Sequence, residues 1–100
     1  MPSLSLTHSH SLGKQEALDR LQRFLARVKE RHQDKVSNLQ ETWNDNQMTY
    51  SFSAYGFSVK GDMVVEDDQV KVNGQLPIAA MMFKGKIEQT IKDELNRVLA

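Results

Sequence analysis

The 100-residue sequence has no cysteine, no long apolar run and no excess of charge of either sign. The lack of cysteine excludes disulfides, thiolate metal sites and a cysteine nucleophile, and it fits a reducing compartment. No apolar stretch approaches the roughly 20 residues that a membrane span needs. Residues 1–14 lack the basic start and continuous apolar run of a secretory signal. We therefore expect a cytoplasmic protein without a membrane span.

The length and composition bound the fold. Hydrophobic residues make up 39% and charged residues 26% of the chain, which is typical of a globular protein. A chain of this length favours one domain, here residues 1–100, with a single core. Lys and Arg balance Asp and Glu at 13 each, so the overall charge does not indicate a nucleic-acid partner.

The N-terminal third changes from a two-residue to a helical period. Apolar and polar residues alternate over 3–10, which predicts a strand, and Ser11 could cap the helix that follows. From Lys14 to about His32 the apolar residues recur at three- and four-residue steps and form one stripe of an amphipathic helix. The members of this stripe are Ala17, Leu18, Leu21, Phe24, Leu25 and Val28.

Four further strands follow, separated by turn residues. Alternation predicts strands around 39–43, 48–53, 57–66 and 70–76. The turns fall at Asn44-Asp45-Asn46, at Ala54-Tyr55-Gly56 and at Asp67-Asp68. Loops this short imply antiparallel hairpins.

The chain ends in a second amphipathic helix that follows Pro77. It contains an unexpected interior glycine, Gly85, which could permit close packing or mark a break between two helical pieces. The element order is then β-α-β-β-β-β-α. We predict an α+β fold in which one curved antiparallel sheet carries two helices on one face.

Polar clusters that could carry chemistry have ordinary structural interpretations. His8 and His10 could share a metal, but His32 is the only other histidine, so we expect no metal site and no cofactor. The structural interpretation of His10 is a half-buried residue at a strand end that donates to a backbone carbonyl. Asp67 and Asp68 indicate a solvated hairpin turn rather than a catalytic carboxylate pair.

Four arginines fall within one arc of the first helix. Arg20, Arg23, Arg27 and Arg31 could form a phosphate-binding stripe. Acidic residues on the same arc, at spacings that allow ion pairs, favour a solvated, salt-bridged face instead.

Residues 76–83 are the most informative stretch, because eight consecutive apolar residues exceed what one helical stripe can bury. Ala80 and Phe83 are predicted to face the core, and Met82 to point nearly the opposite way. Adjacent methionines suit a contact surface or a pocket lining. The other interpretation is a well-buried corner between strand and helix.

The chain resembles the small bacterial proteins of the polyhydroxyalkanoic acid system family, also called the polyhydroxyalkanoate granule-region family. The matching features run through the chain: His10-Ser11-Leu12 before the first helix, Trp43, residues 48–52, Gly61 with residues 63–72, and residues 76–77 with 83–88. The resemblance implies a link to polyhydroxyalkanoate storage. It implies no assigned reaction and no catalytic residues.

Three hypotheses follow, and we favour the first two, in which the protein is not an enzyme. The first is an accessory or interaction protein that binds a granule surface, a granule protein or a second copy of itself as a homodimer. The second is a carrier of a small apolar ligand, in which Trp43, Tyr50, Phe52, Met63 and Met81 line a helix-grip-like pocket. The third and weakest is an enzyme that uses His10 with a carboxylate. The predicted binding residues are Ile78, Met81, Met82 and Phe83, together with Trp43 and His10.

Overall fold

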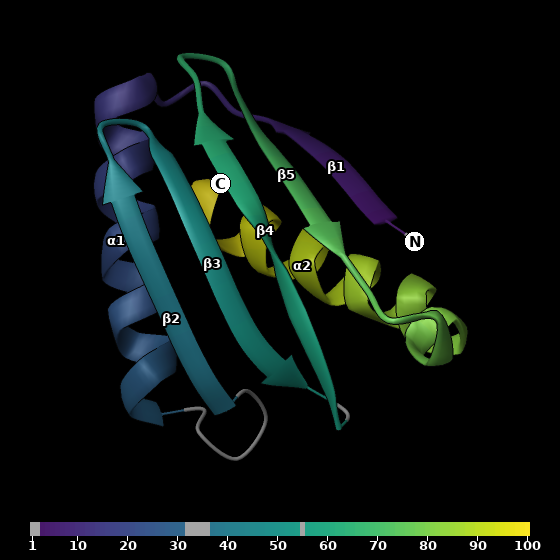
Figure 1. Cartoon of the computed structure of the whole chain (residues 1–100). Helices are drawn as coiled ribbons and strands as arrows, with labels where there is room; N and C mark the ends of the chain where they lie inside the picture. The colour runs from purple at the N-terminus through teal and green to yellow at the C-terminus, as the bar shows by residue number, and fades with distance from the viewer. Residues whose placement is uncertain (1–2, 32–36, 55) are drawn as a thin grey trace.

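A computed structural model describes residues 3–31, 37–54 and 56–100 of the chain. These residues form, in order, β1 (Ser3–Ser9), α1 (Lys14–Arg31), β2 (Ser37–Asn44), β3 (Gln47–Ala54), β4 (Phe57–Val65), β5 (Gln69–Gln75), the 3-10 helix η1 (Ile78–Phe83) and α2 (Lys84–Leu99). The predicted order β-α-β-β-β-β-α and the α+β class are confirmed (Figure 1). His32 and Tyr55, which the predicted helix and turn included, lie outside the described residues.

The five strands form one antiparallel sheet in the order β1-β5-β4-β3-β2. Short turns connect β2 to β3, β3 to β4 and β4 to β5, so each of these neighbours forms an antiparallel hairpin. In the first of these turns, Asp45 takes the left-handed conformation with φ of 58°. β1 pairs with the last strand, from Ser3 opposite Gln75 to Ser9 opposite Gln69. The chain therefore has to cross from one edge of the sheet to the other, and α1 lies in the connection that makes this crossing (Figure 1).

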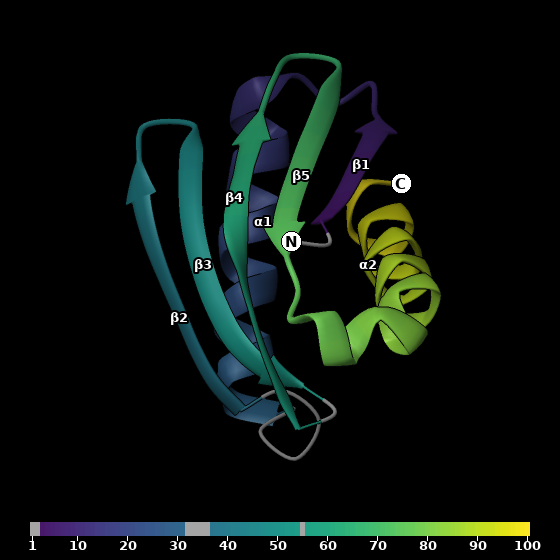
Figure 2. The same cartoon turned by 45° about the vertical axis from the view of Figure 1, so that its right-hand side comes forward.

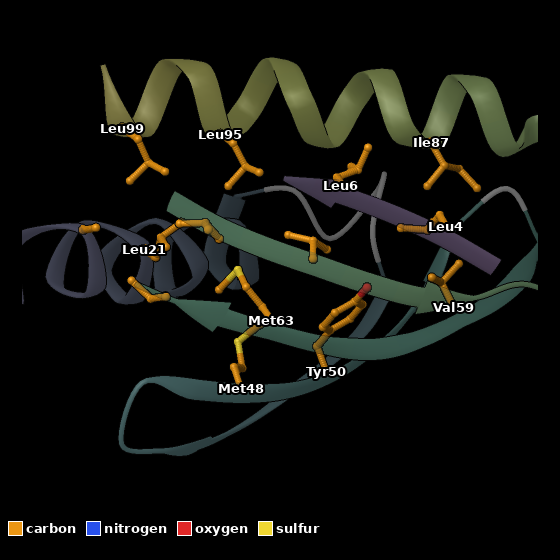
Figure 3. Close-up of a cluster of buried hydrophobic side chains, with 14 of the residues drawn as sticks. Leu4, Leu6, Leu21, Met48, Tyr50, Val59, Met63, Ile87, Leu95 and Leu99 are labelled. Carbon is orange, nitrogen blue, oxygen red and sulfur yellow. The ribbon is translucent and has the colours of Figure 1, made fainter. Parts of the chain in front are cut away.

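Both helices contribute to one core on a single face of the sheet. Directly opposed residues of an antiparallel sheet share a face, and the register aligns Met48, Met63, Val72 and Leu6 in one such row. All four side chains are buried, with Leu21 of α1 and Ile87, Leu95 and Leu99 of α2 in the same cluster (Figure 3). The alternation in the strands thus produces one apolar face, which the two helical stripes cover.

A glycine pair gives Tyr50 its place in the core. Tyr50, Gly61, Gly74 and Leu4 form the next row across four strands. The Tyr50 hydroxyl donates to the carbonyl of Asn73 at 2.8 Å. A Cβ on Gly74 would lie 2.9 Å from that hydroxyl, so a side chain there would crowd it. Burial, and in second place the charge of Asp62, raises the pKa of Tyr50 to about 12.

The start of α1 is held by the β4–β5 turn rather than by the predicted cap, Ser11. The helix begins at Lys14, and the carbonyl of Gly13 accepts the first helical hydrogen bond, from the amide of Ala17 at 3.1 Å. Ser11 therefore lies two residues too early to cap it. The carboxylate of Asp67 accepts from the Lys14 amide at 3.2 Å instead, so the acidic turn has a structural role at the positive end of α1.

The C-terminal helical segment consists of two pieces. The first six residues after Pro77 form η1, and the α-helix starts only at Lys84. The break falls just before Gly85, where an added Cβ would meet nothing within 4 Å. Of the two interpretations of Gly85, close packing is therefore wrong, and a break between two helical pieces is confirmed. Among the described residues, neither helix has the length and apolar character needed to cross a membrane.

Candidate functional site: an exposed apolar corner

The turn between the sheet and α2 exposes large apolar side chains. Ile78 is 73%, Met81 55% and Met82 83% exposed. They belong to η1, which projects beyond the end of β5 where the chain turns back into α2 (Figure 2). We call Ile78, Met81, Met82 and the half-buried Phe83 the apolar corner. The structure thus brings together four of the six predicted binding residues.

The buried side of η1 explains why these side chains point outward. Ala80 is fully buried, and its amide donates to the Pro77 carbonyl at 2.9 Å. Phe83 packs against Phe57 of β4, with ring centroids 5.7 Å apart. Because a 3-10 helix has three residues per turn, Ala80 and Phe83 occupy the inner face and leave Met81 and Met82 outside. The predicted orientations of Ala80, Met82 and Phe83 are confirmed.

Trp43 lies apart from the apolar corner. It is opposite Met48 in the β2–β3 hairpin and packs partly buried against the core. Its indole Nε1 donates to Glu41 Oε2 at 3.0 Å, and Lys29 of α1 pairs with Glu41 Oε1 at 3.2 Å. The Glu41 side chain is only 14% exposed, so this group links β2 to α1 across the core face. Residues two apart in a strand share a face, which accounts for Glu41 beside Trp43, but no local pattern indicated Lys29 as the partner of Glu41.

His10 lies at the opposite end of β1 from the apolar corner. Its Nδ1 accepts from the Leu12 amide at 3.2 Å, so its Nε2 carries the proton and donates to the Glu66 carbonyl at 3.0 Å. The predicted half-buried position and the donation to a backbone carbonyl are confirmed. Ser3 pairs with Gln75 next to the corner, whereas Ser9 pairs with Gln69. The intervening strand separates the two regions by roughly 20 Å.

The residues proposed to line a carrier pocket do not form one lining. Tyr50 and Met63 are buried members of the core, and Trp43 and Phe52 pack partly buried around it. Tyr50 and Phe52 stack with ring centroids 5.9 Å apart. Met81 lies outside this group on the apolar corner. These aromatic and sulfur-containing side chains thus fill the space between sheet and helices.

The uncovered face of the sheet carries an open hollow of about 720 Å³. Short hydroxyl and amide side chains dominate its lining, among them Ser5, Thr42, Thr49, Ser51 and Asn73. These are the polar positions of the strand alternation, which predicts a polar face of the sheet but not the hollow. Ser5 and Asn73 hydrogen-bond each other across β1 and β5 at 3.2 Å.

No group of three or more His, Cys, Asp or Glu side chains suited to a metal ion occurs within the described part of the chain. Among the described residues, every buried side-chain nitrogen or oxygen atom has a hydrogen-bond partner. The most distinctive surface feature therefore remains the apolar corner.

Comparison with protein families gives one match over almost the whole chain. The profile of the family described as putative polyhydroxyalkanoic acid system protein (PHA_gran_rgn) matches residues 4–99. This range includes every strand and helix except the first residue of β1. Searches of curated proteins and of solved structures gave no match.

Proposed function

The chain belongs to the polyhydroxyalkanoic acid system family, and from this premise we propose that it is a non-enzymatic accessory protein that attaches to the surface of polyhydroxyalkanoate granules. The apolar corner makes the contact. The observation that carries this proposal is the exposure of Ile78, Met81 and Met82 on one short turn. An aliphatic polyester offers an apolar surface on which those side chains lose their contact with water.

The expected strength is that of a reversible attachment. Full burial of an exposed Ile or Met side chain contributes about 1.5–3 kcal/mol. Because these three side chains are already partly buried, they supply roughly 3–6 kcal/mol in total. Loss of translational and rotational freedom offsets much of this gain, by an estimated 4 kcal/mol or more. The corner therefore supports weak, exchangeable binding that many copies on one granule would share.

Methionine suits a surface without fixed shape. Its side chain is unbranched and polarizable, so Met81 and Met82 can adapt to an irregular contact. Ile78 is the stiffer member, because β-branching restricts its χ1. The same adaptability would serve a protein partner or a second copy of the chain, so the experiment has to separate these occupants.

Co-sedimentation with washed polyhydroxyalkanoate granules tests the proposal. We expect the parent protein to pellet with the granules and Met82→Glu to remain largely in the supernatant, because a buried unpaired carboxylate is strongly disfavoured. Met82→Leu preserves apolar area and should still bind. Gln22→Glu adds the same charge at an exposed site on α1 and should bind like the parent.

Analytical ultracentrifugation of the same proteins without granules separates self-association from granule binding. Loss of a dimer in Met82→Glu, with granule binding unchanged, would assign the corner to a homodimer interface and overturn the proposal. Equal granule binding by all four proteins, with no change in association state, would also overturn it.

A further inference from the structure

Four guanidinium groups converge where α1 meets the end of α2. A pocket of about 310 Å³ is lined by Arg20, Arg23, Arg27, Arg97 and Val98. The first three arginines follow one another at helical spacings on α1, and Arg97 comes from the last turn of α2. The fold thus brings Arg97 to three of the four arginines in the stripe that the sequence showed. Arg31, the stripe's last predicted member, has a side chain outside the described set.

Ion pairs hold three of these guanidinium groups in place. Glu16 Oε1 lies 3.1 Å from Arg20 Nε, and Asp19 Oδ2 lies 2.8 Å from Arg23 Nη2. Glu94 pairs with Arg97 one turn away on α2. The interpretation of the first helix as a salt-bridged face is therefore confirmed for Arg20 and Arg23. Such exposed pairs contribute little to stability, but they restrict the directions in which the guanidinium groups point.

Arg20 is fixed most firmly. Its Nη1 donates to the main-chain oxygens of Val98 at 3.3 Å and Ala100 at 2.9 Å, in addition to its pair with Glu16. Arg20 therefore ties α1 to the end of α2 and orders the floor of the pocket. A guanidinium has five N–H donors, so Arg20 keeps its Nη2 donors for another acceptor.

The cluster has donors and positive charge beyond its own pairs. Arg23 and Arg97 each use Nη2 in their pairs, and Arg27 has no ion pair among the described residues. Among the described side chains, four guanidinium groups face three paired carboxylates, and Arg27 is the group without a carboxylate partner. An oxyanion placed among the four guanidinium groups would accept hydrogen bonds from several of the remaining N–H donors. Its negative charge would also reduce the repulsion between the guanidinium groups.

We propose that this arginine pocket is a binding site for the phosphate group of a ligand. Arginine forks match phosphate oxygens in paired hydrogen bonds, and four groups converging from two helices surround a compact anion rather than track a strand. The volume is roughly ten times the share of one water molecule in the liquid, which is enough for a phosphate with a second phosphate or an ester group attached.

The site is separate from the apolar corner. Arg97 lies 13 residues beyond the start of α2, which places it roughly 20 Å along the helix from η1 at 1.5 Å per residue. The phosphate site therefore does not rest on the proposed granule contact, and either can fail without the other.

Titration of the protein with pyrophosphate tests the site, with sodium chloride at matched ionic strength as the control. The readout is the Nε–Hε resonances of the arginines in ¹H–¹⁵N spectra, since these report the groups themselves. We expect saturable shifts with pyrophosphate. Arg27→Gln and Arg97→Gln should each weaken binding about tenfold, as expected for loss of one charged hydrogen-bond donor group.

Lys92→Gln removes an equal charge from an exposed site on α2 and should change the affinity less than about twofold. Because Arg27 makes no ion pair in the described structure, Arg27→Gln should melt like the parent, and this keeps a loss of binding interpretable. A parallel arm uses vesicles of phosphatidylcholine with and without phosphatidylglycerol. Binding of pyrophosphate identifies a free phosphate compound, whereas binding only to phosphatidylglycerol vesicles, lost in Arg27→Gln, identifies a lipid headgroup phosphate.

Two results would overturn the proposal. One is the absence of saturable shifts and of arginine-dependent vesicle binding. The other is an equal loss of binding in Lys92→Gln and Arg27→Gln, which would reduce the effect to overall charge.

Discussion

Substitution of Gly61 by alanine should be the most damaging single methyl addition in the sheet. An ideal Cβ on Gly61 would lie 2.0 Å from the carbonyl oxygen of Asn73 and 2.7 Å from Cα of Gly74. Both atoms belong to the backbone of β5, which is paired on its far side with β1. No side-chain rotation relieves this contact, so β4 and β5 have to move apart locally.

The cost has two sources. Overpacking of a well-packed region costs about 1–3 kcal/mol and sometimes more, and a contact at 2.0 Å with backbone belongs at the upper end of that range. Movement of Asn73 would also weaken its hydrogen bond with Tyr50, which is worth about 0.5–1.5 kcal/mol. A total of roughly 3–4 kcal/mol corresponds to a fall in melting temperature of about 15 °C or more for a domain of this size.

Gly85→Ala is the matched control, because it adds the same methyl group where nothing lies within 4 Å. Alanine is favoured over glycine in helices by up to about 1 kcal/mol, so this variant should melt at the same temperature as the parent or slightly above it. Gly74→Ala meets the Tyr50 hydroxyl at 2.9 Å, and side chains can move more readily than backbone. Its cost should therefore lie between those of the other two variants.

Thermal and urea unfolding, followed by circular dichroism, measure all three variants. The expected order of stability is Gly85→Ala, Gly74→Ala and then Gly61→Ala. If Gly61→Ala melted within a few degrees of the parent, this would contradict the close contact between β4 and β5 at Gly61. A shared loss in Gly61→Ala and Gly85→Ala would point to a general effect of the added methyl group instead.

Two further predictions concern polar groups. Asp67→Ala removes the carboxylate that accepts from the first amide of α1 and should cost about 1 kcal/mol, whereas Asp68→Ala should cost less than about 0.5 kcal/mol in the same urea titration. The raised pKa of Tyr50, about 12, predicts stability that is complete below pH 10 and falls as the pH rises through 12, by roughly 2–3 kcal/mol in total. In a Tyr55→Phe background, the phenolate absorbance of Tyr50 should appear near pH 12. The added Tyr50→Phe change should remove this part of the pH dependence of stability. A phenolate transition near pH 10 in the folded protein would contradict the burial of the hydroxyl.

Most of the elements were predictable from periodicity, because each strand and helix shows its own hydrophobic spacing. The turn at Asp45 was predictable from residue chemistry. Strand pairing was not, because the residues of β5 that pair with β1 lie 60 to 72 positions away and no local pattern specifies β5. The helix cap shows the same limit. Ser11 was the local candidate, and the acceptor that the fold supplies is Asp67, which lies 53 residues from the Lys14 that it caps.

The candidate sites were predictable to the same extent. The apolar excess of residues 76–83 indicated that some side chains had to remain outside the core, and the three-residue period of η1 decides which ones. The arginine stripe of α1 was visible in the sequence. The contribution of Arg97 was not, because it requires the packing of α2 against α1.

Methionine oxidation of the unmodified protein tests the granule contact most directly. Met81 and Met82 are exposed, whereas Met48 and Met63 are each 5% exposed and serve as internal references. In solution, mild peroxide should oxidise the first pair much faster than the second. On washed polyhydroxyalkanoate granules, the oxidation of Met81 and Met82 should slow markedly, while the slow rates of Met48 and Met63 stay the same. Unchanged rates at Met81 and Met82 in protein that has sedimented with the granules would show that attachment occurs elsewhere and would contradict the proposed contact.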